Sequence, residues 1–167
     1  MARCSARAAD AGGHRARQLS KINEMNNVKL PPDVEFYEDI RLIVWRPRGL
    51  VNKAALNKII TVLGELETML KEPFNRFSDT VGADAVDLNF EYIIHVSLYR
   101  RSFYGKLPPI KSAILATDAT LIHYGKVHAL LTQGSPINVR VFQDRKEAAR
   151  WLGVPIAILV ADADQYQ

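Results

Sequence analysis

The segment that decides the fold reads FNRFSDT at residues 74–80 and continues VGADAVDLN at residues 81–89. The first part is typical of a short strand that ends in polar residues. We interpret the second part as a loop that turns at Gly82 and leads into a helix, with Asp87 or Asn89 as the cap. In open α/β sheets, ligands and partners meet the carboxyl ends of strands, so we expect any working site at this corner.

The rest of the chain alternates between strand and helix patterns. Residues 34–37 and 40–45 predict a tight hairpin around Glu38-Asp39, and the apolar residues on both faces of its second strand indicate a central position in a sheet. The further expected elements are a helix between Asn52 and Pro73, a strand at 74–79, a helix at 89–104 capped at its end by Gly105, a strand at 110–116, a helix at 119–132 after Thr117 or Asp118, an edge-like strand at 137–143, and a helix at 145–152 between Asp144 and Gly153. This order predicts an α/β fold with a mixed, mostly parallel five-stranded sheet and about four helices.

The apolar spacing also predicts which helix faces point inward. The expected inner positions of the 89–104 helix are Phe90, Ile93, Ile94, Ser97, Leu98 and Arg101. In the 119–132 helix, Ile122, Ala129 and Leu130 are expected to face inward, with Gly125 allowing close approach to a neighbour. The apolar residues 154–160 are expected to pack on the domain rather than on a second subunit, because a bare apolar strip would promote association.

The chain divides by composition into three parts. Residues 1–32 are rich in Ala, Arg, Gly and Asn and have no apolar periodicity, so we expect a disordered leader. It is interpreted as an extension with Met25 as an alternative start, and an organelle transit peptide is the competing interpretation. Residues 33–153 form the expected domain and 154–167 a tail. Cys4 is the single cysteine of the sequence, which suits a reducing compartment, and we expect a cytoplasmic protein.

The distribution of charge and the absence of known motifs argue against several classes of function. The net charge of +4 is concentrated in the leader, and residues 25–167 carry 17 basic and 16 acidic residues. This near balance lacks the basic footprint of nucleic-acid binding, so no nucleic-acid partner is expected. No apolar run approaches the roughly 20 residues that span a bilayer. The sequence has no GxSxG, Walker A or dinucleotide-binding motif, and we expect neither enzymatic activity nor a cofactor.

Three groups of polar residues could still carry chemistry. Asp79, Asp84 and Asp87 could hold a metal, but aspartates in one loop more often form turns and caps, so no metal site is expected. His95, His123 and His128 lack a shared ligand spacing and are interpreted as partly exposed helix residues. The third group ends the 89–104 helix and comprises Tyr99, Arg100, Arg101, Tyr104 and Lys106. It complements the helix dipole, and the alternative is a site for an anion or headgroup.

Several local phrases add a resemblance to a known family. Together with the element order over residues 33–153, the phrases at 73–79, 109–113, 141–142 and 148–152 resemble the STAS domain, specifically the SpoIIAA-like group. STAS proteins that antagonise anti-sigma factors carry an aspartate at the end of the third strand and a second aspartate eight residues later, before a phosphorylated serine. Asp79 and Asp87 keep this spacing, but the serine position holds Leu88, which has no hydroxyl to phosphorylate.

The resemblance implies a non-enzymatic regulatory or binding module of a bacterial cytoplasm, without the phosphorylation switch. Its expected partner is an unidentified protein, and the protein itself is expected to be a monomer or a homodimer. The residues expected to bind this partner are Ser78, Asp79, Thr80, Asp84, Asp87, Leu88 and Asn89. The alternative function is a carrier of a small apolar ligand or lipid, because some SpoIIAA-like proteins resemble the lipid-transfer Sec14 fold. The helices at 89–104 and 119–132 would then flank the pocket.

Overall fold

A five-stranded sheet forms the centre of the computed structural model, which describes residues 29–70, 72–103 and 108–160. Its strands are β1 (Val34–Tyr37), β2 (Leu42–Trp45), β4 (Asn75–Asp79), β6 (Ile110–Leu115) and β7 (Ile137–Phe142). They lie side by side in the order β1-β2-β4-β6-β7. The β1–β2 pair is antiparallel and the other neighbours are parallel. The predicted fold class, a mixed and mostly parallel sheet, is therefore confirmed.

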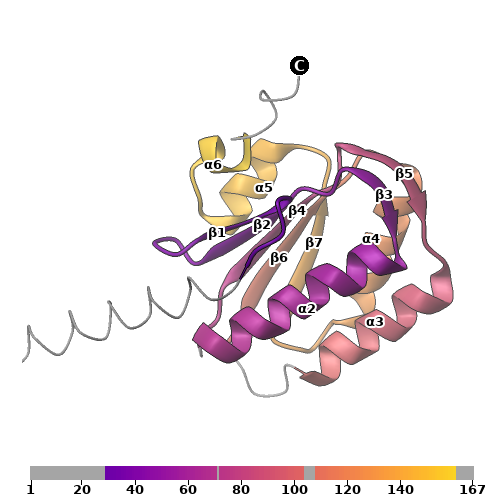
Figure 1. Cartoon of the computed structure of the whole chain (residues 1–167), viewed down its shortest axis with the longest axis horizontal. Coiled ribbons are helices and arrows are strands. Elements are labelled where there is room, and N and C mark those ends of the chain that lie inside the picture. The colour runs from indigo at the N-terminus through magenta and orange to yellow at the C-terminus, as the bar shows by residue number, and fades with distance from the viewer. Residues whose placement is uncertain (1–28, 71, 104–107, 161–167) are drawn as a thin grey trace, which may run out of the picture.

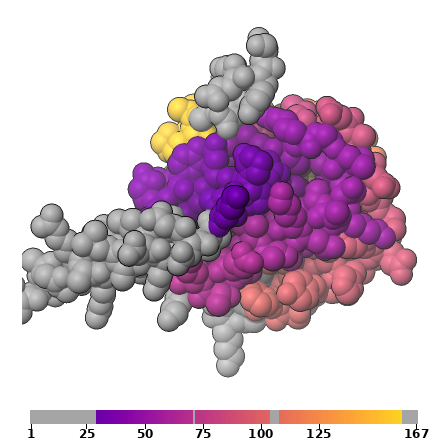
Figure 2. Space-filling model, viewed as in Figure 1, coloured from indigo at the N-terminus to yellow at the C-terminus, as the bar shows by residue number. Residues whose placement is uncertain are grey.

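Helices cover both faces of this sheet (Figure 1). The long helices α2 (Lys53–Leu70), α3 (Phe90–Phe103) and α4 (Ala119–Leu131) lie on one face, and the short helices α5 (Arg145–Leu152) and α6 (Ile156–Val160) lie on the other. Two layers of helices explain why β2, LIVW in sequence, is buried along its whole length. In the space-filling view, the segments from β1 to α2 make up much of the visible face, and α3 runs along its edge (Figure 2).

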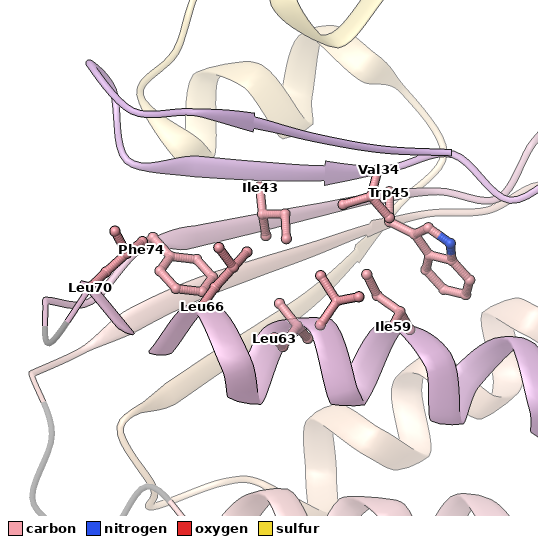
Figure 3. Packing of buried hydrophobic residues seen from close by; sticks show 9 residues of the cluster. Val34, Ile43, Trp45, Ile59, Leu63, Leu66, Leu70 and Phe74 are labelled. Atoms are coloured by element: carbon pink, nitrogen blue, oxygen red, sulfur yellow. The ribbon is translucent and has the colours of Figure 1, made fainter. Parts of the chain in front are cut away.

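The face under α2 holds an apolar core (Figure 3). Ile43 and Trp45 of β2 meet the inner stripe of α2, whose buried residues are Ile59, Val62, Leu63, Leu66 and Leu70. Phe74, which precedes β4, is 2% exposed and makes an edge-to-face contact with Phe36 at a centroid distance of 5.5 Å. This core fixes α2 against the sheet and so sets one wall of the site described below.

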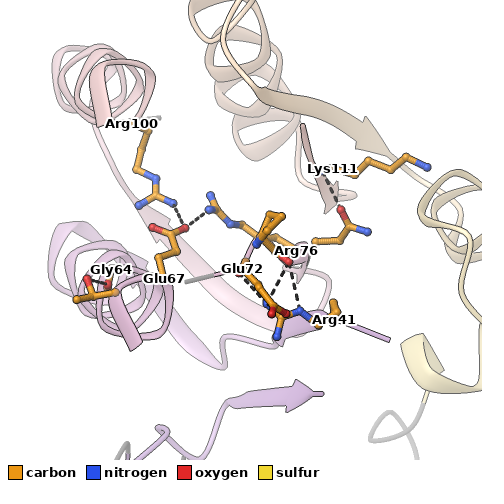
Figure 4. Close-up of polar contacts among 10 residues, drawn as sticks. Arg41, Gly64, Glu67, Glu72, Arg76, Arg100 and Lys111 are labelled. Atoms are coloured by element: carbon orange, nitrogen blue, oxygen red, sulfur yellow. Dashed lines mark hydrogen bonds and ion pairs between the residues drawn. The ribbon is translucent and has the colours of Figure 1, made fainter. Parts of the chain in front are cut away.

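The hairpin at the start of the domain is wider than predicted. Tyr37 pairs with Leu42, so four residues form the connection and β2 begins two residues later than expected. Arg41 closes the turn in the left-handed region, with a φ of 51°. Its guanidinium donates to the backbone carbonyls of Glu72, at 2.7 Å, and Pro73, which holds this unusual conformation in place (Figure 4).

The predicted helix caps are present, and the open alternatives are resolved. The Asn52 side chain accepts from Ala55 N at 2.9 Å, and Asn89, not Asp87, accepts from Tyr92 N at 2.8 Å. Asp118, not Thr117, caps α4, and Asp144 caps α5. Gly153 ends α5 in the left-handed region, as expected of a C-terminal cap. The cap predicted at Gly105 lies outside the described residues.

The prediction of residues 81–89 as a loop is wrong. Residues Ala83–Asp87 form strand β5, which pairs in parallel with a second unexpected strand, β3 (Gly49–Asn52). The two form a separate two-stranded sheet. β2 and β4 are parallel neighbours in the main sheet. The strands that follow them in the sequence, β3 and β5, leave this sheet and pair with each other. This second pairing was missed because neither four- to five-residue segment is rich in β-forming residues.

The predicted inner faces of α3 and α4 need correction. Phe90 and Leu98 are 49% and 47% exposed, and Leu130 is 68% exposed. In α3 the buried residues are Ile93, Ser97 and Arg100, so the inner stripe is rotated away from the predicted Arg101. Gly125 does allow close approach: a Cβ built there would lie 2.7 Å from Val141 Cγ2. α4 therefore packs tightly on β7, the predicted edge strand.

Residues 154–160 pack within the molecule, as predicted. Residues 156–160 form α6, and Leu159 is 1% exposed in a core cluster with Leu42, Val44 and Phe77. Ile156 and Val160 on the same helix remain partly exposed. The proposed boundaries of the domain at residues 33 and 153 stay a prediction.

Candidate functional site

A cavity of about 160 Å³ lies between the sheet and the helices α2, α3 and α4. Its walls are mostly branched aliphatic side chains. They include Ile59, Ile60 and Leu63 of α2, Ile93 and Val96 of α3, Leu121 of α4, and Ile43 and Ile114 of the sheet. Close approach of α4 at Gly125 closes one side, since Gly125 itself lines the cavity. The predicted helix pair α3 and α4 thus does flank a pocket, together with α2.

Two buried arginines line this apolar cavity. Arg76 lies in β4 and is 6% exposed, and Arg100 lies in α3 and is 4% exposed. Both guanidiniums converge on Oε1 of Glu67 in α2, with Arg100 Nη2 at 3.4 Å and Arg76 Nη2 in close contact (Figure 4). Glu67 does not itself line the cavity. The charged side chains among the described residues of the cavity wall are therefore the two cations, Arg76 and Arg100.

The arginine pair joins three elements that are distant in sequence. Burying an ion in a protein costs several kcal/mol unless other groups compensate, and Glu67 supplies that compensation to both guanidiniums at once. Arg76 also lies over the ring of Phe74, with its guanidinium carbon 5.8 Å from the ring centroid. The ion cluster therefore holds β4, α2 and α3 in a fixed arrangement around one end of the site.

Ser97 and His128 form a second polar contact on the cavity wall. Ser97 is fully buried; its Oγ lies 2.6 Å from the carbonyl oxygen of Ile93 and 2.8 Å from Nδ1 of His128. A hydroxyl has a single proton, which Ser97 donates to the Ile93 carbonyl. His128 Nδ1 must then carry the ring proton and donate to Ser97, which leaves Nε2 as an acceptor. Burial, and to a lesser extent the nearby charges of Arg100 and Arg76, lower the pKa of His128 to about 4, so the ring is neutral at pH 7.

This histidine makes stability fall in acid. The unfolded chain protonates His128 near its ordinary pKa of 6.5, but the folded protein does so only near pH 4. The folded state therefore loses stability as the pH falls from 6.5 to 4, by at most about 3 kcal/mol from this residue, and loses nothing above pH 7.

We expect denaturant unfolding of His128→Asn to show a smaller decrease in the free energy of unfolding between pH 6.5 and 4 than the wild-type protein shows. His123→Asn on the exposed side of α4 is the control, and an identical pH dependence in all three proteins would contradict the assignment.

The segment predicted to bind a partner splits into an inner and an outer group. Ser78, Thr80 and Leu88 line the cavity. Thr80 is buried, and its hydroxyl donates to the Leu115 carbonyl at 2.7 Å. Leu88 packs beside Val51 and Leu121 and directly precedes Asn89, the cap of α3. The residue that stands at the serine position of STAS proteins is thus part of the cavity wall.

The acidic residues of the same segment do not act together. Asp79 is 3% exposed, and its carboxylate accepts from Arg145 Nη2 at 2.8 Å and Nε at 3.2 Å, so it ties the start of α5 to the end of β4. Asp84 and Asp87 are exposed on β5, and Asn89 is exposed at the start of α3. Within the described ranges, no three His, Cys, Asp or Glu residues gather as metal ligands would. Whether Ser78, Asp79, Thr80, Asp84, Asp87, Leu88 and Asn89 bind a partner stays a prediction.

The sequence interpretation missed the ionic part of the site. His95 and His123 are exposed and His128 is half-buried, and the prediction did not foresee that His128 also lines the cavity. Arg100 belongs to the group for which an anion or headgroup site is the alternative to helix-dipole complementation. It lines the cavity, but its neighbours Arg101 and Tyr99 are exposed, and Tyr104 and Lys106 lie outside the described residues. A signal for Arg76 was present: the cation stands between Phe74 and Phe77 in a predicted strand, and a cation that such a strand buries requires a buried partner.

Comparisons with known proteins give a structural neighbour. No family model and no curated protein matches the sequence. Among solved structures, the chain is similar to an uncharacterised protein of the DUF3478 family from Shewanella loihica PV-4, described as having a SpoIIAA-like fold. The alignment has a TM-score of 0.46 and 18% identity, and covers 71% of this chain and 90% of the other. The neighbour's description names the group that the sequence phrases resemble. This is a likeness of fold and says nothing about a ligand or an activity.

Proposed function

We propose that this protein is a non-enzymatic binding module that holds a small, mostly apolar molecule in the cavity under α2, α3 and α4. The observation that carries the proposal is the cavity itself, about 160 Å³ in volume and walled by aliphatic side chains from four elements. Well-packed cores leave few voids larger than a water molecule. An apolar cavity of about 150 Å³ binds benzene in an engineered protein, so a space of this size suits a ligand of about six to eight carbon atoms.

The Ser97–His128 contact does not favour catalysis. A serine nucleophile needs a base that accepts its hydroxyl proton. In this protein the Ser97 hydroxyl donates to the Ile93 carbonyl, so the imidazole acts as a donor toward it. The contact therefore supports a binding role, in which it fixes the wall between α3 and α4.

Methyl NMR tests the proposal. We expect titration with 1-octanol, which carries no charge, to shift the methyl resonances of Ile60, Leu63 and Val96 in a saturable way. Val96→Trp fills the cavity from α3 and should abolish the saturable shifts. His95→Trp adds the same side chain one residue earlier, where the helix faces solvent, and should leave them unchanged. Linear, unsaturable shifts in the wild-type protein would overturn the proposal.

A protein-binding role remains the second candidate. It is favoured by one observation: the inner residues Thr80 and Leu88 touch the cavity, while Asp84 and Asp87 of the same segment are exposed. A partner that recognises this surface would sit against the wall of the ligand site. Pull-downs with the wild-type protein and with Asp84→Ala/Asp87→Ala test it, with the exposed Glu65→Ala as control. A specific partner that all three proteins retain equally would argue against the surface.

None of the described helices is long and apolar enough to cross a membrane.

A further inference from the structure

We infer that the cavity selects a ligand that carries a carboxylate, with the carboxylate bound by Arg76 and Arg100 and the apolar part lying among the aliphatic side chains. This inference rests on the proposed function and names the ligand class for that same cavity. The ligand is a small aliphatic or aromatic carboxylic acid in its ionised form.

The first argument is geometric. Arg76 from the sheet and Arg100 from α3 both line the cavity, and both place Nη2 near the same oxygen of Glu67. Glu67, which lies outside the cavity lining, thereby holds the two guanidiniums together at one end of the cavity. A guanidinium presents several N–H donors in a fixed plane, which match the two oxygens of a carboxylate. The donors are thus oriented before a ligand arrives, which reduces the entropic cost of binding.

The second argument is electrostatic. The described residues that line the cavity include two cations and no carboxylate, and the single Glu67 outside the lining balances one of the two positive charges, so the cluster keeps a net charge of +1. Both cations are buried, and a charge in a medium of low dielectric constant attracts an opposite charge more strongly than it does in water. His128 on the same wall responds to this potential, because both arginines disfavour its protonated form. The cavity therefore favours an anion over a neutral molecule, and a neutral molecule over a cation.

The third argument concerns size. A volume of about 160 Å³ leaves little room for a phosphate ester or a larger headgroup beside an apolar chain. A carboxylate adds only three heavy atoms, and its planar shape fits against a guanidinium. A carboxylate is thus the anionic group that both fits the available space and matches the donors of the two arginines.

A headgroup series on the wild-type protein tests the inference. Octanoate, 1-octanol and octylamine share one chain and differ in charge, and each is titrated at pH 7.5 with methyl NMR as the readout. We expect octanoate to bind about tenfold or more tightly than 1-octanol, which is the scale of one charge-assisted hydrogen-bond pair, and octylamine to bind most weakly. Equal affinities for octanoate and 1-octanol would overturn the headgroup inference and leave the apolar site intact. Saturable binding by none of the three would overturn the proposed function itself.

A matched pair of variants then locates the headgroup. Arg100→Leu should remove the preference for octanoate over 1-octanol while retaining the binding of 1-octanol. Arg101→Leu changes the neighbouring arginine, which is exposed and touches the Leu131 carbonyl at 3.5 Å, and should keep the wild-type preference. An unchanged preference in a folded Arg100→Leu protein would contradict the assignment. If this variant does not fold, as judged by its amide spectrum, the wild-type headgroup series decides alone.

Discussion

Replacing Glu67 by glutamine is expected to lower the free energy of unfolding by about 3–5 kcal/mol, because it breaks a buried ion cluster from its centre. The Glu67 side chain is 9% exposed and pairs with Arg76 and Arg100, whose side chains are 7% and 5% exposed. Glutamine keeps the size and one acceptor oxygen but loses the charge, which leaves two guanidiniums in a poorly solvated place without its compensation. Urea denaturation at pH 7 measures the change.

The control for this variant is Glu65→Gln on the same helix. Glu65 is exposed, so its substitution should change the free energy of unfolding by less than about 0.5 kcal/mol. A loss for Glu67→Gln as small as that for Glu65→Gln would show that the cluster does not stabilise the fold. The further substitution Glu67→Leu also tests whether charge or shape matters, since leucine fills similar space without any acceptor.

Phe74→Ala is expected to destabilise the protein by about 3–5 kcal/mol, the range measured for large buried aromatic residues. Phe74 is among the most deeply buried large side chains, and its substitution removes contacts to Phe36, to the guanidinium of Arg76 and to the α2 core. The same denaturation experiment measures the loss. Phe90→Ala is the control, because Phe90 is 49% exposed and should cost about 1 kcal/mol or less. Similar losses for the two variants would contradict the described core.

The parts of the fold that the sequence predicted are those with strong local signals. β2 is a continuous apolar run, and Asn52, Asp118 and Asp144 cap helices through hydrogen bonds to residues three positions later. Such contacts depend on neighbours in sequence and can be recognised from residue type and spacing. The mostly parallel character of the main sheet followed from the alternation of strands and helices along the chain.

The parts that escaped prediction depend on partners far away in the chain. β3 and β5 are strands because they pair with each other over more than thirty residues, not because GLVN or ADAVD favours extended structure. The predicted inner face of α3 was partly wrong because apolar residues occur all around the helix, and its true inner face includes Arg100. An arginine is buried at acceptable cost only beside a carboxylate. The carboxylate that pairs with Arg100 belongs to Glu67, which is 33 residues away in the sequence.

Strand β4 also sets a limit on how this chain can change in length. Its side chains alternate: Arg76 and Ser78 line the cavity under the long helices, whereas Phe77, which also borders the cavity, packs among the residues beneath α5, and Asp79 binds Arg145 of that helix. Inserting or deleting a single residue within β4 would exchange the two faces, so that a guanidinium would enter the aliphatic layer and a phenyl ring would meet Glu67. The five residues of β4, Asn75–Asp79, must therefore keep their number if both faces of the strand are to meet their present neighbours.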